Sequence, residues 1–183
     1  TNILDSTSYN NNGAKFHWPS WTVVSNSPVE IDGKIGKCQS NPNLGDGNSI
    51  LIDYFDKRDT GQTLSLWYYM IPDPGMATWQ GIFIKRHSML LGFNTGSSPM
   101  SLWYRPNWES PDIIAQHASV ATGTWVYVST RYDDVSSNAW VYVNGALIGG
   151  PTVTAQDKHA AQWWQLFKTE DKDDFLGHID EVR

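Results

Sequence analysis

The stretch Gly123–Gly150, GTWVYVSTRYDDVSSNAWVYVNGALIGG, contains the tetrapeptide WVYV twice, once on each side of a polar turn. Successive side chains of a β-strand point to opposite faces, so in each copy the valines share one face and the aromatic residues the other. The valine face is expected to be the core face, because the aromatic face also carries Arg131 and Asn144, which are costly to bury without partners. The hairpin therefore predicts an outward-facing set: Tyr127, Arg131, Trp140 and Tyr142.

The rest of the chain repeats this rhythm of short strands and turns. Runs rich in Val, Ile, Tyr, Trp and Leu alternate with turn signals such as IDGK, PDPG and VNG, a pattern typical of an all-β sandwich or barrel. Strands are expected at Ser49–Tyr54, Thr63–Ile71, Gly81–Lys85, Met89–Phe93, Met100–Arg105, Trp125–Tyr132, Ala139–Asn144, Gln165–Lys168 and Phe175–Val182. A short helical turn or a loop is expected at Ile113–Val120.

The composition narrows the class of protein. With 183 residues, 17% of them charged and 13% aromatic, the chain is expected to form one β-rich domain over residues 1–183. A net charge of -6, with Lys85–His87 as the only tight basic cluster, argues against a nucleic-acid partner. No apolar run approaches the roughly 20 residues that span a bilayer, so membrane insertion is not expected. The abrupt ending IDEVR suggests a domain excised from a longer chain.

Met100–Arg105 also places aromatic residues beside an arginine: Leu102 and Tyr104 share one face, and Trp103 and Arg105 the other. Aromatic rings stack on the apolar C–H faces of sugars, while arginine and amide groups read the hydroxyls. The candidate ligand-binding residues are Trp103, Arg105, Trp108, Tyr127, Arg131, Trp140 and Tyr142, with Trp79, Trp163 and Trp164 expected in loops. The alternative is that loops or a neighbouring chain cover these rings, or that cross-strand pairs stabilise the sheet by roughly 0.2–1 kcal/mol each.

Several blocks of the sequence resemble laminin-G-like domains, which are concanavalin A-like jelly rolls. The WVYV hairpin agrees with their signature hairpin, and DSTSYNNNGA, DGKIGKC, TLSLWYYM and FLGHIDEVR agree in order, so the resemblance covers nearly the whole chain. It implies a two-sheet antiparallel β-sandwich whose first and last strands pair, with one sheet concave. It further implies a non-catalytic module of secreted, cell-surface, phage or viral proteins that binds glycans or proteins, often with calcium.

Three groups are candidate calcium sites, of which Asp46 and Asn48 in LGDGNS equally fit an ordinary turn. The segment TEDKDD resembles the acidic calcium loop of pentraxins, a related jelly-roll family; the residues concerned are Glu170, Asp171, Asp173 and Asp174. The loop where pentraxins place further acidic ligands here holds Lys85–His87, so a solvated acidic turn is the alternative. In similar sandwich modules an aspartate of the final IDEV strand, here Asp180, holds a structural ion with the N-terminal segment, which suggests Asp5 as its partner.

Catalysis is not expected from these residues. Glycoside hydrolysis needs two carboxylates held roughly 5–10 Å apart, and no glutamate sits in the E-x-D-x-x-E spacing of the catalytic jelly-roll glucanases. The leading hypothesis is a non-enzymatic module that binds a glycan through an aromatic-lined concave sheet or its loop rim, outside the cell or on a cell or virion surface. The competing hypothesis is a structural or adhesive domain of a phage tail, virion or cell-surface assembly that makes protein contacts only.

Overall fold

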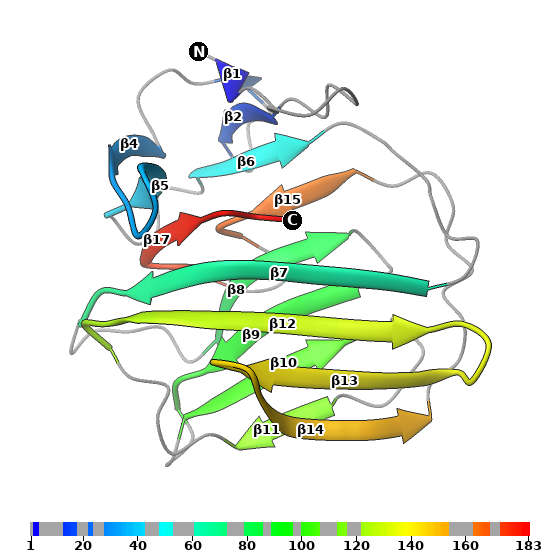
Figure 1. The fold of residues 1–183 in the computed structure, drawn as a ribbon. Helices are drawn as coiled ribbons and strands as arrows, with labels where there is room; N and C mark the ends of the chain where they lie inside the picture. Colours follow the sequence, from blue (N-terminus) through cyan, green and yellow to red (C-terminus); the bar gives the residue numbers. More distant parts are fainter. Residues whose placement is uncertain are drawn as a thin grey trace.

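The computed structural model describes residues 2–3, 13–17, 22–23, 28–42, 48–52, 61–72, 79–85, 89–96, 100–106, 113–116, 122–153, 163–168 and 173–183. Their secondary structure consists of strands that form two sheets (Figure 1). In this described part of the chain, no helix is long and apolar enough to cross a membrane.

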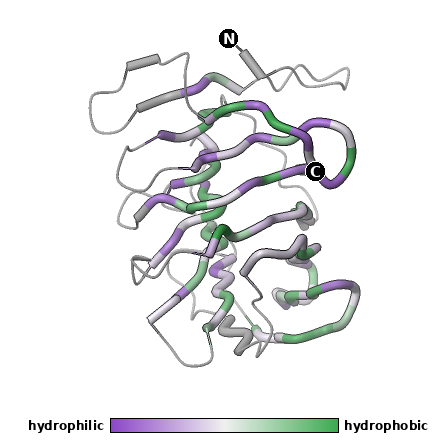
Figure 2. Tube along the Cα trace, turned by 90° about the vertical axis from the view of Figure 1, so that its left-hand side faces the viewer, coloured by the Kyte–Doolittle hydropathy of each residue, from purple (hydrophilic) through white to green (hydrophobic). Residues whose placement is uncertain are grey.

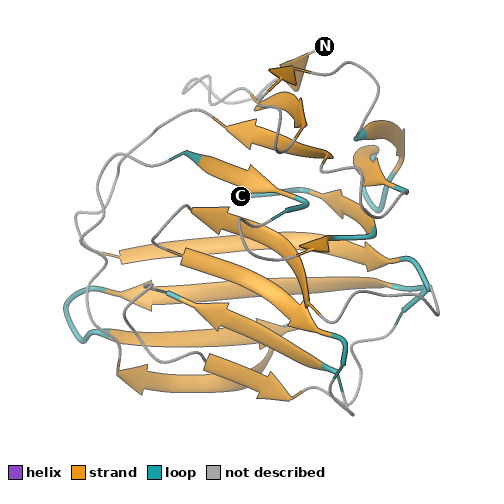
Figure 3. Cartoon of the chain, turned by 180° about the vertical axis from the view of Figure 1, so that it is seen from behind, coloured by secondary structure: helices purple, strands orange, loops and turns teal. Residues whose placement is uncertain are grey.

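The two sheets stack as layers of a sandwich, with the seven-stranded sheet in front in Figure 1 and the ten-stranded sheet in front in the reverse view of Figure 3. The ten-stranded sheet follows the order β1 (Asn2–Ile3), β2 (Gly13–His17), β6 (Asn48–Ile52), β15 (Trp164–Leu166), β8 (Trp79–Lys85), β9 (Met89–Asn94), β10 (Ser101–Arg105) and β11 (Ile113–Gln116), with β3 (Thr22–Val23) beside β2 and β16 (Asp173–Asp174) beside β8. The seven-stranded sheet follows the order β14 (Ala146–Val153), β13 (Asn138–Val143), β12 (Trp125–Asp133), β7 (Gly61–Met70), β17 (Gly177–Asp180), β5 (Lys37–Asn41) and β4 (Val29–Asp32). Neighbouring strands pair antiparallel, except that β16 runs parallel to β8.

The core lies between the two sheets and is built from the alternation that the sequence shows. On β12 and β13, Val126, Val128, Val141 and Val143 are at most 3% exposed, so the valine face of the hairpin is the core face as predicted. Each fully buried side chain of this kind contributes roughly 1.5–3 kcal/mol. Figure 2 shows the same alternation, with hydrophilic and hydrophobic residues following one another along the strands.

The all-β sandwich is confirmed, and three details of the sequence prediction are wrong. Part of the segment expected to be a helical turn or loop, Ile113–Gln116, is strand β11, which pairs with β10. The last strand, β17, pairs with β5 and β7, whereas β1 pairs with β2 in the other sheet, so the first and last strands do not pair. Trp79 and Trp164 lie in strands β8 and β15, not in loops.

Candidate functional site

The outer face of the seven-stranded sheet carries a continuous set of aromatic side chains. They come from the four central strands β13, β12, β7 and β17, all of which the structure describes in full. We call this surface the aromatic face; its residues are Trp67, Tyr69, Trp125, Tyr127, Arg131, Trp140, Tyr142 and His178. The seven ring-bearing residues are half-buried and Arg131 is exposed. The outward orientation predicted for Tyr127, Arg131, Trp140 and Tyr142 is therefore confirmed.

The rings of the aromatic face contact one another across the strands. The ring centroids of Trp67 and Tyr127, on paired positions of β7 and β12, are 5.2 Å apart. Those of Tyr69 and Trp125 are 5.7 Å apart and meet edge to face. These are the offset and edge arrangements that aromatic pairs prefer, each worth about 0.5–1.5 kcal/mol beyond area burial. The contacts hold the rings in fixed orientations.

Two cationic side chains lie over rings of this face. The guanidinium carbon of Arg131 lies 5.0 Å from the Trp140 ring centroid, and the ammonium nitrogen of Lys34 lies 5.1 Å from that of Trp67. Arg131 also forms an ion pair of 3.5 Å with Asp133. The aromatic face thus combines flat apolar surface with several hydrogen-bond donors.

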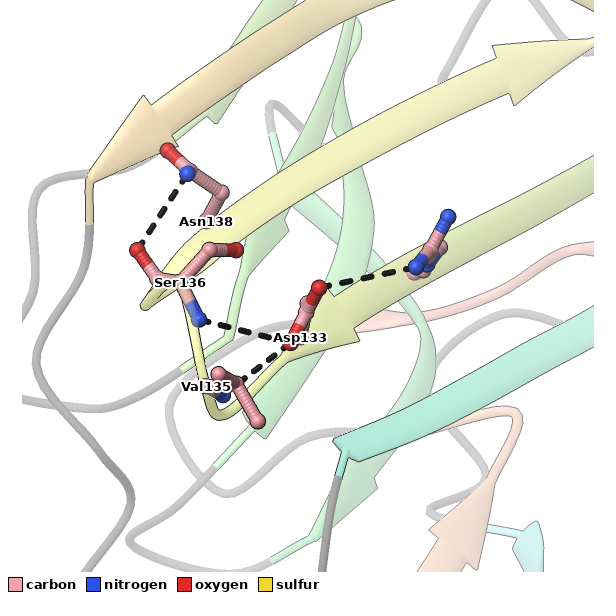
Figure 4. A network of polar contacts seen from close by, with 5 residues as sticks. Asp133, Val135, Ser136 and Asn138 are labelled. Atoms are coloured by element: carbon pink, nitrogen blue, oxygen red, sulfur yellow. Dashed lines mark hydrogen bonds and ion pairs between the residues drawn. The ribbon is translucent and has the colours of Figure 1, made fainter.

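The turn after β12 orients Asp133 (Figure 4). The carboxylate Oδ1 accepts hydrogen bonds from the backbone N–H groups of Val135, at 3.0 Å, and Ser136, at 3.4 Å. These hydrogen bonds, that from Ser136 above all, together with the positive charge of Arg131, lower the pKa of Asp133. The carboxylate therefore stays charged and holds Arg131 at the end of the hairpin.

Asn144 does not belong to the aromatic face, which corrects the prediction made from strand alternation. β13 ends at Val143, and Asn144 begins the turn with a φ of 49°, followed by Gly145 at 82°. Both residues have the positive φ of a hairpin turn that favours Asn-Gly. The side-chain Oδ1 of Asn144 accepts a hydrogen bond of 3.0 Å from the backbone N–H of Tyr127. Asn144 therefore forms the turn between β13 and β14 and connects that turn to β12.

His178 connects the aromatic face to β5. Its ring stacks on Tyr69 with centroids 5.0 Å apart, and its Nδ1 lies 2.8 Å from the Ser40 hydroxyl. Desolvation by burial lowers the pKa of His178. The neutral imidazole is therefore the form that the fold favours at this position.

The predicted residues Trp103 and Arg105 lie on the other side of the molecule. They belong to β10 in the ten-stranded sheet, where Leu102 and Tyr104 face the core and are fully buried. Trp103 and Arg105 alternate with them and therefore point to the outer face of that sheet. The sequence prediction combined both pairs into one candidate set, and the structure separates that set into two surfaces on opposite faces.

Trp103 forms one half of a ring corner on this second surface. Its ring meets that of Trp79, from β8, at 87° with centroids 4.3 Å apart. Its indole N–H donates a hydrogen bond of 2.8 Å to the hydroxyl of Ser101, two residues earlier on the same strand. Sequence reasoning missed Trp79 as a partner, because only the register of β8, β9 and β10 brings it to Trp103.

The described acidic residues give one buried carboxylate that is relevant to the calcium prediction. Asp180 is 4% exposed, and its Oδ2 accepts a hydrogen bond of 2.8 Å from the N–H of Ile35 in the β4–β5 turn. Asp174 is also buried, and it pairs with Lys168 at 2.7 Å. Among the described residues, no three His, Cys, Asp or Glu side chains gather as a metal site. Asp173 is the first residue of β16. The calcium candidates Asp5, Glu170 and Asp171 lie outside the described residues, as does the ligand-binding candidate Trp108.

Cys38 is the single cysteine of the chain, and its thiol is a potential nucleophile. It is 3% exposed, and burial, with the nearby carboxylates of Asp180 and Asp32, raises the pKa of its thiol to about 11. A thiol in this environment stays protonated at neutral pH and is a poor nucleophile.

The family model of the concanavalin A-like lectin/glucanases superfamily matches residues 44–183. The chain belongs to this superfamily. The match covers both sets of outward aromatic residues and the C-terminal strand that carries Asp180. No curated protein matches the sequence.

Solved structures of other proteins share the fold of this superfamily member. Domain 4 of AbnA, an extracellular GH43 arabinanase from Geobacillus stearothermophilus, in complex with arabinotriose, has a TM-score of 0.75 at 19% identity, covering 99% of this chain and 85% of that one. A heptameric SAP-like pentraxin from Limulus polyphemus has a TM-score of 0.52 at 16% identity, covering 67% and 62%. A putative carbohydrate binding protein from Bacteroides ovatus has a TM-score of 0.53 at 15% identity, covering 77% and 41%.

Proposed function

We propose that the domain is a non-catalytic module that binds a glycan on the aromatic face. The observation that carries this proposal is the kind of side chain found there. On the outer face of β13, β12, β7 and β17, every aromatic side chain carries a polar N–H or O–H group, and none of these four fully described strands places an aliphatic side chain on it. Such rings stack on sugar C–H groups and also bond to hydroxyls.

The interior of the same domain has the opposite composition. All four phenylalanines with described side chains, Phe83, Phe93, Phe167 and Phe175, lie in the core, together with the aliphatic residues and three buried tyrosines. Every described phenylalanine side chain thus lies in the core, and every ring of the aromatic face carries a polar N–H or O–H group. The residue types of the aromatic face favour a ligand that is part apolar and part hydroxylated, which describes an oligosaccharide.

The relatives with the same fold support this proposal. One of them is a domain with bound arabinotriose, and another is named as a putative carbohydrate binding protein. Both are bacterial, and the first belongs to an extracellular enzyme. We therefore propose an extracellular or cell-surface location and a role in holding carbohydrate, without a reaction of its own.

A protein-contact role in a phage tail, virion or cell-surface assembly remains the competing proposal. Interfaces between proteins bury a core enriched in Tyr, Trp, Phe, Met and Arg, and this face has the Tyr, Trp and Arg without the Phe and Met. Aliphatic side chains reach it from the flanking strand β14, where Leu147 is 51% and Val153 73% exposed. The centre of the face favours sugar, and only its edge resembles a protein contact.

Binding is tested by titrating tryptophan fluorescence with oligosaccharides, starting with arabinotriose and continuing across a glycan array. Tyr127→Ala combined with Trp140→Ala is expected to weaken binding at least tenfold, because central aromatic contacts of binding sites typically contribute 1–2 kcal/mol or more. Val135→Ala is the matched control, since Val135 is 88% exposed at the tip of the neighbouring turn. Absence of binding to every glycan of the array, with and without calcium, would refute the proposal.

Calcium remains part of this proposal as a structural ion. Calcium takes six to eight oxygen ligands, and of the two buried carboxylates among the described residues, that of Asp174 pairs with Lys168, whereas that of Asp180 lies under the β4–β5 turn. Asp180 fits the group as a single carboxylate ligand, with further ligands required from backbone carbonyls or from Asp5. Calcium is expected to raise the melting temperature of the wild-type protein and to have no effect on Asp180→Asn. An equal response of the two proteins would refute a site at Asp180.

A further inference from the structure

We propose that the ligand of the aromatic face is an acidic oligosaccharide, whose anionic groups are bound by Lys34 at one end of the face and by Arg131 at the other. This inference rests on the proposed function, because it requires a glycan at this site. It adds the charge of that glycan and the two side chains that select it.

The charges that remain accessible on the aromatic face are positive. Apart from His178, whose neutral form the fold favours, its four strands carry three ionisable residues at outward positions: Arg131, Asp133 and Asp180. The carboxylate of Asp133 is occupied by its turn and by Arg131, and that of Asp180 is buried under the β4–β5 turn. The side chain of Arg131 is 55% exposed. A guanidinium has five N–H donors, so its ion pair with Asp133 leaves donors for a ligand.

Lys34 is the second cation of this face. Its ammonium nitrogen lies 5.1 Å from the centroid of the Trp67 ring, and no ion pair between described residues includes it. Lys34 is exposed, so the side of the ammonium group that is turned away from the ring is accessible. Hydrogen bonds from an ammonium group to an anionic oxygen are roughly twice as strong as those between neutral groups. Lys34 therefore favours an anionic group on the ligand.

The β4–β5 turn holds Lys34 in place over the aromatic face. Asp180 lies across from Trp67 in the pairing of β17 with β7, and its Oδ2 accepts the 2.8 Å hydrogen bond from Ile35. A Cβ atom at Gly33 would lie 2.6 Å from the same oxygen, so the turn lies directly on the carboxylate. A backbone that is already fixed loses less conformational entropy when its side chain binds a ligand.

The two cations lie at opposite ends of a strip of rings. Trp67 is paired with Tyr127 of β12, and Trp140 is paired with Arg131, four residues further along the same strand. Four residues of a strand extend about 13 Å. A ligand that extends from Trp67 to Trp140 therefore meets a positive charge at each end. This spacing fits a short oligosaccharide with anionic groups on more than one sugar residue.

The net charge of the whole chain, -6, does not oppose this assignment. At physiological ionic strength, exposed charges more than about 8 Å apart are largely screened from each other. Cations in direct contact with the ligand therefore act on it more strongly than carboxylates elsewhere on the domain. The attraction is local to the aromatic face.

The test compares trisaccharides that differ in charge: trigalacturonate with its neutral methyl ester, and sulfated cellotriose with unmodified cellotriose. Isothermal titration calorimetry is expected to show about tenfold or more tighter binding of one acidic probe than of its neutral counterpart. The pair that shows this preference distinguishes a carboxylate from a sulfate ester as the anion. Raising the NaCl concentration from about 0.05 M to about 0.5 M is expected to weaken the binding of the acidic probe only.

Lys34→Gln tests the first of the two cations. It is expected to weaken binding of the preferred acidic probe about fivefold and to change that of the neutral counterpart less than about twofold. Lys34→Arg retains the charge and is expected to restore the preference. Lys37→Gln is the matched control, because it removes one positive charge from the same hairpin, where Lys37 pairs with Asp32 and not with a ring.

The outcomes separate this inference from the proposed function. Equal affinity for acidic and neutral probes, with loss of both in the double variant Tyr127→Ala and Trp140→Ala, overturns the acidic ligand and leaves the glycan site in place. An acidic preference that Lys34→Gln lowers no more than Lys37→Gln does overturns the role of Lys34. An acidic preference that depends on Lys34 but persists in the double variant overturns the aromatic face as the site. Absence of binding to every trisaccharide and to every glycan of the array overturns both proposals.

Discussion

The two outer faces of this sandwich use the same residue types in different surroundings. On the seven-stranded sheet the rings form a broad field over four strands, and two of them, Trp67 and Trp140, lie beneath a cation. On the ten-stranded sheet two rings, Trp79 and Trp103, form a perpendicular corner beside glycine backbone. The first surface is stabilised by contacts between its own side chains. The second surface depends on the close packing of the β8 and β9 backbones at Gly92.

Gly92→Ala tests how far the second surface depends on backbone fit. The added methyl group would lie 2.6 Å from the Gln80 carbonyl oxygen, so β8 or β9 must shift. Overpacking of this kind typically costs about 1–3 kcal/mol. A fall of that size in the free energy of unfolding, measured by chemical denaturation, is expected.

Gly145→Ala is the matched control for this substitution. Gly145 has a φ of 82°, and an added Cβ would meet nothing within 4 Å. Only backbone strain is then introduced, about 1–2 kcal/mol, far from the ring corner. A loss of stability in Gly145→Ala as large as that in Gly92→Ala would contradict the overpacking at Gly92.

His178 tests how far the aromatic face depends on its internal contacts. Burial lowers its pKa in the folded state, while the unfolded chain keeps the ordinary value of about 6.5. As the pH falls through about 6.5, the unfolded chain takes up the proton first, so this contribution to stability is present above that pH and is lost below it. Melting temperatures measured between pH 7.5 and pH 5 are expected to fall.

The control for this pH dependence is His178→Asn, in which an amide retains the contact with Ser40 and does not titrate. Its melting temperature is expected to change less over the same pH range than that of the wild type. If both proteins show the same slope, other groups cause the pH dependence, and the stack of His178 on Tyr69 does not select the neutral form.

The sequence predicts which way these side chains point but not which sheet they belong to. Alternation is local, so Val128 and Tyr127 are assigned to opposite faces from neighbouring positions alone, and the structure confirms both. Sheet membership depends on pairing between distant segments, such as Gly177 with Met70. For this reason Trp103 and Trp140 have the same local pattern and lie on opposite sides of the molecule. The prediction for Asn144 is wrong because β13 ends at Val143, and side chains alternate between the two faces only within the strand.

Arg131→Gln gives the smallest expected effect and addresses the aromatic face most directly. An exposed cation–π contact such as that of Arg131 with Trp140 contributes only about 0.5–1 kcal/mol. If Arg131 serves mainly to read a ligand, the substitution is expected to lower trisaccharide affinity by more than it lowers the free energy of unfolding. Lys37→Gln is the control, because Lys37 pairs with Asp32 on the exposed surface without a ring. A loss of stability without a loss of affinity would mean that the cations of this face support its rings, and that the ligand meets the rings alone.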